Sequence, residues 1–137
     1  MRLVPTLMTA VALAGLSAPA VAAPVVLVAT LTGGDAGSGD ADGSGSFTVE
    51  IDADAGDFCY TLKASNIDKP TMAHVHEGAA GTNGGPVITL EMAEDLCIAV
   101  EPAKLEPILA NPANFYVNVH NAAYPAGAIR GQLAKKQ

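Results

Sequence analysis

Two of the three histidines in the chain stand two residues apart, His74 and His76, in the segment 71–77 (TMAHVHE). Alternate residues of a β-strand point to the same face, with Cα atoms roughly 6.6–6.8 Å apart, so both imidazoles can reach one metal ion if this segment is extended. The third histidine, His120, ends another strand-like segment, 115–120. All three imidazoles meet if the fold brings the two segments together.

Three imidazoles form an all-nitrogen ligand set, which suits copper, zinc or nickel, and copper leads on affinity. We therefore expect one copper ion at His74, His76 and His120, with zinc as the less favoured metal. The competing interpretation is that these histidines are structural and order the glycine-rich segment after His76. Met72 shares the face of His74 and His76, so it is either a soft copper ligand or, as is more common for methionine, a filler of the core.

Three further polar residues lie near these histidines in the predicted elements. Glu77 follows His76 and is interpreted as an acceptor for an imidazole proton or a general base, against the alternative of a solvated loop carboxylate. Asn118 shares the face of His120 by strand alternation. Arg130 either holds a carboxylate or backbone carbonyls across the sheet or guides an anion to the metal. No Ser-His-Asp or Cys-His arrangement is present, so the sequence leaves open whether the protein is an enzyme.

The apolar pattern predicts about eight short strands, frequent turns and almost no helix. We expect Pro102 to start a helix and Pro107 to interrupt it, which allows one or two helical turns in 101–112. Segment 33–45 is predicted to be a mobile, solvated loop, and 135–137 a frayed tail. The fold class is all-β, an antiparallel Greek-key-like β-sandwich. The predicted strands are 24–32, 46–52, 58–65, 71–76, 86–90, 96–100, 115–121 and 128–133.

The two cysteines, Cys59 and Cys97, are predicted to form one disulfide, because an even number of cysteines in an exported protein indicates such a bond. Each cysteine lies off the apolar face of its predicted strand, which is typical of a surface crosslink. A thiolate metal site is the alternative, and the absence of Cys-x-x-Cys spacing disfavours it.

Residues 1–22 have the pattern of a secretory signal peptide, with Arg2 before an apolar stretch and a small-residue cleavage site at 20–22 (AVA). Residues 23–137 then form one exported domain, periplasmic or extracellular, with no membrane span after cleavage. The net charge of −7 disfavours nucleic acid, whose phosphates require Lys and Arg.

Four motifs, in order, resemble the CHRD domain, which is named after chordin and occurs in many exported bacterial proteins. They are 73–78 (AHVHEG), 84–88 (GGPVI), 116–121 (YVNVHN) and 127–133 (GAIRGQL). The resemblance covers nearly the whole mature chain. It implies the fold and export more firmly than an activity, and in chordin-like proteins it implies an interaction module.

The segment after residue 73 is also similar, more faintly, to the His-Val-His strand of copper/zinc superoxide dismutases. That similarity places His74, His76 and His120 on copper-ligand positions and Arg130, loosely, on that of an anion-guiding arginine. The bridging histidine of those enzymes has no counterpart here, because the chain has only three histidines, so a dinuclear site is excluded. The sequence thus favours a copper-binding protein, with an interaction module and a dismutase-like oxidoreductase as alternatives.

Overall fold

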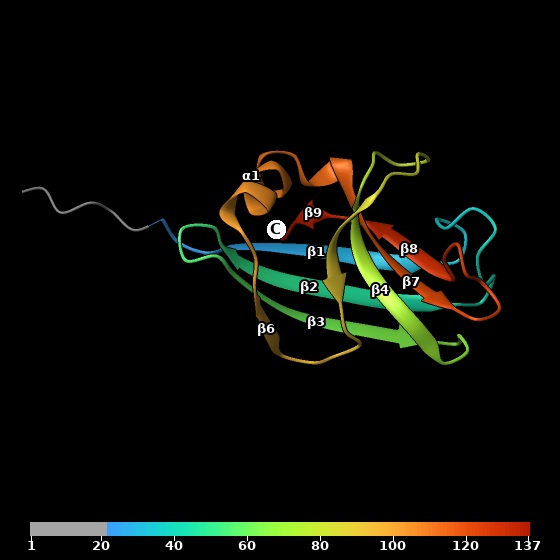
Figure 1. Cartoon of the computed structure of the whole chain (residues 1–137). Helices are drawn as coiled ribbons and strands as arrows, with labels where there is room; N and C mark the ends of the chain where they lie inside the picture. The colour runs from blue at the N-terminus through green and yellow to red at the C-terminus, as the bar shows by residue number, and fades with distance from the viewer. Residues whose placement is uncertain (1–21) are drawn as a thin grey trace, which may run out of the picture.

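The computed structural model describes residues 22–137. The expected signal peptide, 1–22, therefore lies outside the described residues except for Ala22. Within them, one curled antiparallel sheet makes up most of the fold, and one short helix, α1, lies at an end of it (Figure 1). The elements are β1 Val25–Thr32, β2 Ser44–Asp52, β3 Asp57–Ser65, β4 Pro70–Glu77, β5 Pro86–Leu90, β6 Leu96–Ala99, α1 Pro102–Ala110, a 3-10 turn Pro112–Asn114, β7 Phe115–Asn121, β8 Ile129–Gln132 and β9 Ala134–Lys135.

The strands follow the order β5-β4-β7-β8-β1-β2-β3-β6, and β9 lies beside β1. Every strand pair is antiparallel. The connection from β3 to β4 carries the chain from one half of the sheet to the other, as in a Greek key. The predicted all-β, sandwich-like fold class is confirmed.

Strand alternation explains why the sheet curls around one core. In β2, Phe47, Val49 and Ile51 are at most 1% exposed, whereas Thr48 and Glu50 between them are exposed. β3 pairs with β2 along its whole length and buries its own alternate apolar residues on the same inner side. The apolar inner faces of both halves of the sheet form one hydrophobic cluster.

Helix α1 covers the core at one end of the sheet through Leu105 and Ile108, which are fully buried. Pro102 occupies the first turn, as predicted, but the prediction that Pro107 interrupts the helix is wrong. The helix continues to Ala110, because the burial of its apolar side outweighs the one hydrogen bond that Pro107 cannot donate.

The tail 135–137, predicted to be frayed, is partly paired with the sheet. Ala134 and Lys135 form β9 against β1, so the tail is not frayed from residue 135, and the amide of Lys136 donates to the carbonyl of Val26. In the loop 33–43, the amide of Asp40 donates to the carbonyl of Ala128 at 2.8 Å, which anchors this loop to the start of β8. Residues 44 and 45, predicted to end this loop, instead begin β2.

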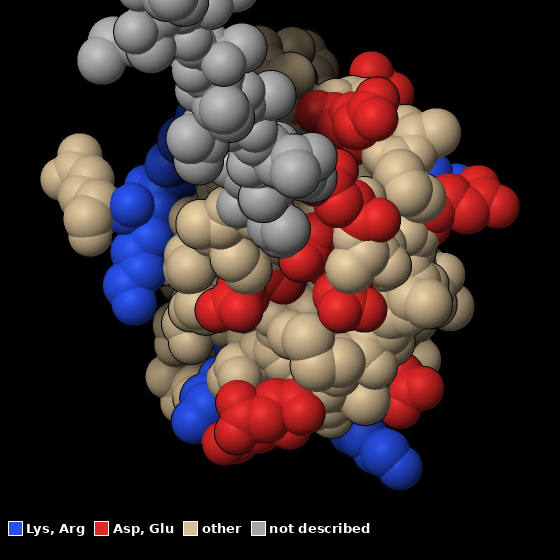
Figure 2. Space-filling model, turned by 90° about the vertical axis from the view of Figure 1, so that its left-hand side faces the viewer, with Lys and Arg blue, Asp and Glu red and all other residues tan. Residues whose placement is uncertain are grey.

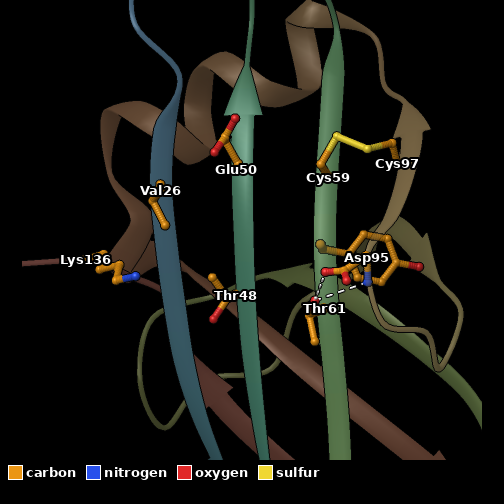
Figure 3. A pocket seen from close by; sticks show the side chains of 9 residues that line it. Val26, Thr48, Glu50, Cys59, Thr61, Asp95, Cys97 and Lys136 are labelled. Carbon is orange, nitrogen blue, oxygen red and sulfur yellow. Dashed lines mark hydrogen bonds between the residues drawn. A yellow bond between two sulfur atoms is a disulfide. The ribbon is translucent and has the colours of Figure 1, made fainter.

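Cys59 and Cys97 form a disulfide between directly opposed residues of β3 and β6. The predicted disulfide is confirmed, and it excludes a thiolate metal site at these residues. Figure 3 shows the bond on the outer side of the sheet, beside a groove of about 370 Å³. The side chains that line the groove belong to Val26, Thr48, Glu50, Cys59, Tyr60, Thr61, Asp95, Cys97 and Lys136.

Acidic side chains gather at the end of the molecule that carries the β2–β3 turn, where Asp54 lies between the strand ends Asp52 and Asp57 (Figure 2). Asp52 accepts hydrogen bonds from the amides of Asp54 and Ala55 within that turn.

Among the described residues, no helix is long and apolar enough to cross a membrane.

Candidate metal centre

The three histidines lie on the outer face of the β4–β7 strand pair. The inner face of the same pair is apolar, because Ala73, Val75, Val117 and Val119 are fully buried in the core. The outer face carries two rows of side chains. In register, Met72 lies opposite His120, His74 opposite Asn118, and His76 opposite Tyr116. The pairing of β4 with β7 therefore places His120 beside the two histidines of β4.

The imidazole rings converge. His74 Nδ1 lies 3.4 Å from His120 Nε2, and one ring nitrogen from each histidine lies within 4.8 Å of the others. Two nitrogens bound to one tetrahedral ion at 2.0–2.1 Å would be about 3.3–3.4 Å apart. The His74–His120 pair already has this spacing, and the nitrogen of His76 lies within 4.8 Å of both. The three residues can therefore hold one metal ion.

Backbone carbonyls fix the orientation of two of the rings. His76 Nδ1 donates to the carbonyl of Gly84 at 2.9 Å, and His120 Nδ1 donates to the carbonyl of Pro125 at 3.0 Å. In both rings Nδ1 therefore carries the proton, and Nε2 keeps its lone pair. The Nε2 atom of His76 is buried and has no hydrogen-bond partner. A buried acceptor without a partner is costly, and a metal ion at this place would satisfy it.

Two loops cover this outer face and bring those carbonyls into position. The first, 78–85, follows β4, and the second, 122–128, joins β7 to β8. A side chain at Gly84 would place its Cβ 1.6 Å from the carbonyl oxygen of Glu77, so the backbone can approach only because residue 84 is glycine. Gly127 has φ +137°, and a Cβ there would lie 2.3 Å from Asn118 Oδ1.

Arg130 holds the first of these loops. Its side chain is 5% exposed, and its guanidinium donates to Asn83 Oδ1 at 3.1 Å, to the Ala79 carbonyl at 3.2 Å and to Gln132 Oε1 at 3.0 Å. Its Cζ atom also lies 3.4 Å from the centroid of the Tyr116 ring. Arg130 therefore holds the loop through the Ala79 carbonyl and the Asn83 side-chain amide, rather than through a carboxylate.

Tyr116 connects Arg130 to the histidines. Its ring stacks on the ring of His76, with centroids 4.9 Å apart and planes 7° apart, and its side chain is 2% exposed. Tyr116 was not predicted as a site residue, although strand alternation already places it on the face of Asn118 and His120. Gln132 was also missed. Its Nε2 donates to the carbonyls of Gly78, Ala113 and Phe115, which holds the start of the same loop.

Asn118 and Glu77 lie in different surroundings. Asn118 is buried, its Nδ2 donates to the carbonyl of Ala126 at 3.2 Å, and its Oδ1 has no partner. Asn118 thus holds the second loop beside the histidines. Glu77 is exposed and follows the alternation of β4 away from the histidine face. Among the described residues, its carboxylate makes no hydrogen bond to a histidine.

The surroundings favour neutral imidazoles. Burial lowers the pKa of His74, and the neighbouring His120 and His76 lower it further. Burial also lowers the pKa of His76. The hydrogen bond to Gly84 opposes this shift, while His120 and Arg130 add to it. A neutral imidazole is the form that binds a metal, so these two histidines are in the binding form at neutral pH.

The model of the CHRD domain family matches residues 27–133 of this chain. The chain therefore belongs to the CHRD domain family, which confirms the resemblance seen in its motifs. In the same comparisons, no curated protein and no solved structure gave a match.

Proposed function

We propose that this chain is an exported CHRD-domain protein that binds one copper ion, or less favourably zinc, through His74, His76 and His120. The observation that supports the proposal most strongly is the buried, unpartnered Nε2 atom of His76, whose ring clusters with those of His74 and His120. The ligand atoms would be Nδ1 of His74 and Nε2 of the other two. A copper ion held there would supply a redox-active centre.

The residues around the cluster have distinct supporting roles in this proposal. Gly84 and Pro125 keep His76 and His120 in the binding tautomer through their carbonyls. Arg130 and Asn118 hold the two covering loops and do not bind the ion themselves. Glu77 has no assigned role, since it is exposed on the other side of β4.

Export is part of the proposal. The signal-peptide pattern in residues 1–22 supports it, and so does the Cys59–Cys97 disulfide, because such bonds persist in oxidising compartments. N-terminal sequencing of the protein recovered from the periplasm or the medium tests it. A mature chain that begins at Ala23 is the expected result, and a chain that stays in the cytosol with residues 1–22 attached would contradict it.

The metal proposal is tested by elemental analysis of protein purified without chelator and by copper and zinc titrations at neutral pH. Near-stoichiometric copper that is lost in His76→Ala supports it. Thr48→Ala is the control, because Thr48 is exposed on β2 in the other half of the sheet, away from the histidines, and should leave binding unchanged. A circular dichroism spectrum shows whether each variant is folded.

The alternatives predict other outcomes. Protein without metal, with weak binding that His76→Ala does not change, would contradict the copper proposal and favour an interaction module with structural histidines. Superoxide dismutation that depends on added copper would favour the oxidoreductase. Copper binding without dismutation would identify a binding protein rather than that enzyme.

A further inference from the structure

Met72 lies beside the histidine cluster on the same face of the sheet. It is opposite His120 in the β4–β7 register, and it precedes His74 by two residues on β4. Directly opposed residues of an antiparallel pair have Cβ atoms about 4.5–5.5 Å apart, and alternate residues of one strand share a face. The flexible side chain of Met72 is therefore within reach of an ion bound between His74 and His120.

Met72 does not fill the core, which corrects the more common interpretation of such a methionine. Its side chain is 52% exposed, and it is one of two exposed large hydrophobic side chains in the described part of the chain. Exposure falls along the strand, from Met72 through the half-buried His74 to His76 at 8%. The end of the cluster near Met72 is thus the end that faces solvent, where an ion would enter.

The charges around the cluster favour a monovalent ion. The two fixed rings bond to neutral carbonyls, and no carboxylate contacts the three histidines among the described residues. The positive charge of the Arg130 guanidinium acts on His76, since Arg130 lies against Tyr116, and Tyr116 stacks on His76. Repulsion by a fixed positive charge is twice as large for a divalent ion as for a monovalent one. A neutral ligand set beside an arginine therefore disfavours Cu(II) and Zn(II) relative to Cu(I).

We propose that Met72 is a fourth, soft ligand that closes onto the ion held by the three histidines and makes the site selective for Cu(I) over Zn(II). Thioether sulfur binds Cu(I) and is a poor ligand for zinc, so Met72 would strengthen the binding of one ion only. Because Met72 lies at the exposed end, its rotation would also admit and release copper. This inference rests on the proposed three-histidine site.

The test compares Met72→Leu with Met92→Leu. Leucine keeps the apolar volume but has no sulfur, and Met92, 39% exposed between β5 and β6, is the control. Cu(I) affinity is measured without oxygen against a chromophoric chelator, and Zn(II) affinity against a fluorescent indicator. We expect Met72→Leu to weaken Cu(I) binding at least about tenfold and to leave Zn(II) binding unchanged. X-ray absorption of the Cu(I)-loaded wild type should show one sulfur neighbour, which Met72→Leu loses and Met92→Leu keeps.

Other results separate this inference from the site on which it rests. Copper binding that depends on His76, with no sulfur neighbour and the same Cu(I) affinity in Met72→Leu, would overturn the role of Met72 and leave the histidine site intact. Equal losses for Cu(I) and Zn(II) in Met72→Leu would also overturn it, because they would indicate a structural effect. Absence of copper binding in the wild type would overturn the proposed function itself.

Discussion

The two halves of the sheet have outer faces of different character. On β1, β2, β3 and β6, the outer side is open and polar, with Thr48 and Glu50 exposed beside the groove and the disulfide (Figure 3). On β4, β7 and β8, the outer side is covered by two loops, and the side chains of His76, Asn118, His120 and Arg130 are each at most 8% exposed. Polar side chains that face outward normally remain in water, so their burial here is unusual.

That difference agrees with the proposed metal site on the covered face. Burying polar groups without partners costs free energy, and on this covered face two such atoms have none, His76 Nε2 and Asn118 Oδ1. Among residues 22–137, no buried side-chain nitrogen or oxygen on the open face lacks a partner. The unpartnered atoms beside the three imidazoles therefore lower the free energy of unfolding of the covered face. The open face instead carries the disulfide, which raises it.

The largest expected effect tests whether the two faces are independent. Replacing both cysteines, Cys59→Ser with Cys97→Ser, should lower the free energy of unfolding by up to about 4 kcal/mol, because the bond closes a loop with a sequence separation of 38. Copper affinity should stay the same, because the disulfide joins β3 to β6 in the other half of the sheet. Urea denaturation and a copper titration of the folded double variant measure the two effects. A parallel loss of copper affinity would show that the faces are coupled.

Sequence alone predicts most of the fold, because each strand buries one side. β5 and β7 have the predicted bounds, and β4 is one residue longer at each end than predicted. The errors, β9 and the helix through Pro107, occur where contacts with distant residues decide the structure. Local alternation cannot reveal that residue 134 pairs with residue 28, nor that the core holds a helix together across a proline.

The candidate site likewise has a part that local sequence predicts and a part that depends on contacts between distant residues. Strand geometry alone places His74 and His76 on one face, but their contact with His120 depends on the β4–β7 register, which alternation does not determine. The carbonyls of Gly84 and Pro125 carry no signal in the sequence, since every residue has one. In the sequence, only the glycines of the first loop, 78–85, indicate that the backbone of this loop lies close to the histidines.

Arg130 provides the second prediction, because it stabilises the covered face. Arg130→Gln removes donors from the Ala79 carbonyl, Asn83 and Gln132, and should lower the free energy of unfolding by about 2–3 kcal/mol. It should also raise the pKa of His76, because the guanidinium charge lowers that pKa in the native protein. Arg130→Lys is the matched control, since it keeps the charge but loses the planar fork. Urea denaturation and an NMR titration of the apo protein measure both effects; an unchanged His76 pKa in Arg130→Gln would contradict the electrostatic part.

The third prediction concerns the backbone of the second covering loop. Gly127→Ala places a Cβ on a residue with φ +137°, where it clashes with the side-chain amide of Asn118. The variant should lower the free energy of unfolding by about 1–3 kcal/mol. Because the loop carries the Pro125 carbonyl that orients His120, copper affinity should fall about tenfold. Gly37→Ala is the control, with φ +81° and nothing within 4 Å of the added Cβ. If both variants kept the affinity of the wild type, the loop would not be positioning His120.

The smallest expected effect is the pH dependence of the apo protein, which follows from burying neutral imidazoles. The pKa of an unfolded histidine is about 6.5, and the folded pKa values of His74 and His76 are lower. Between the two values the unfolded chain binds more protons, so stability falls as the pH drops below about 6.5 and levels off once the folded histidines are also protonated. Urea denaturation at pH 7.5, 6.5 and 5.5 measures it, and His76→Gln should weaken the dependence. Two results would contradict this prediction: a free energy of unfolding that does not change with acid, or a His76→Gln variant that keeps the full pH dependence. Either would mean that folding does not lower the pKa of His76. The covered face would then not favour the neutral imidazole that a metal requires.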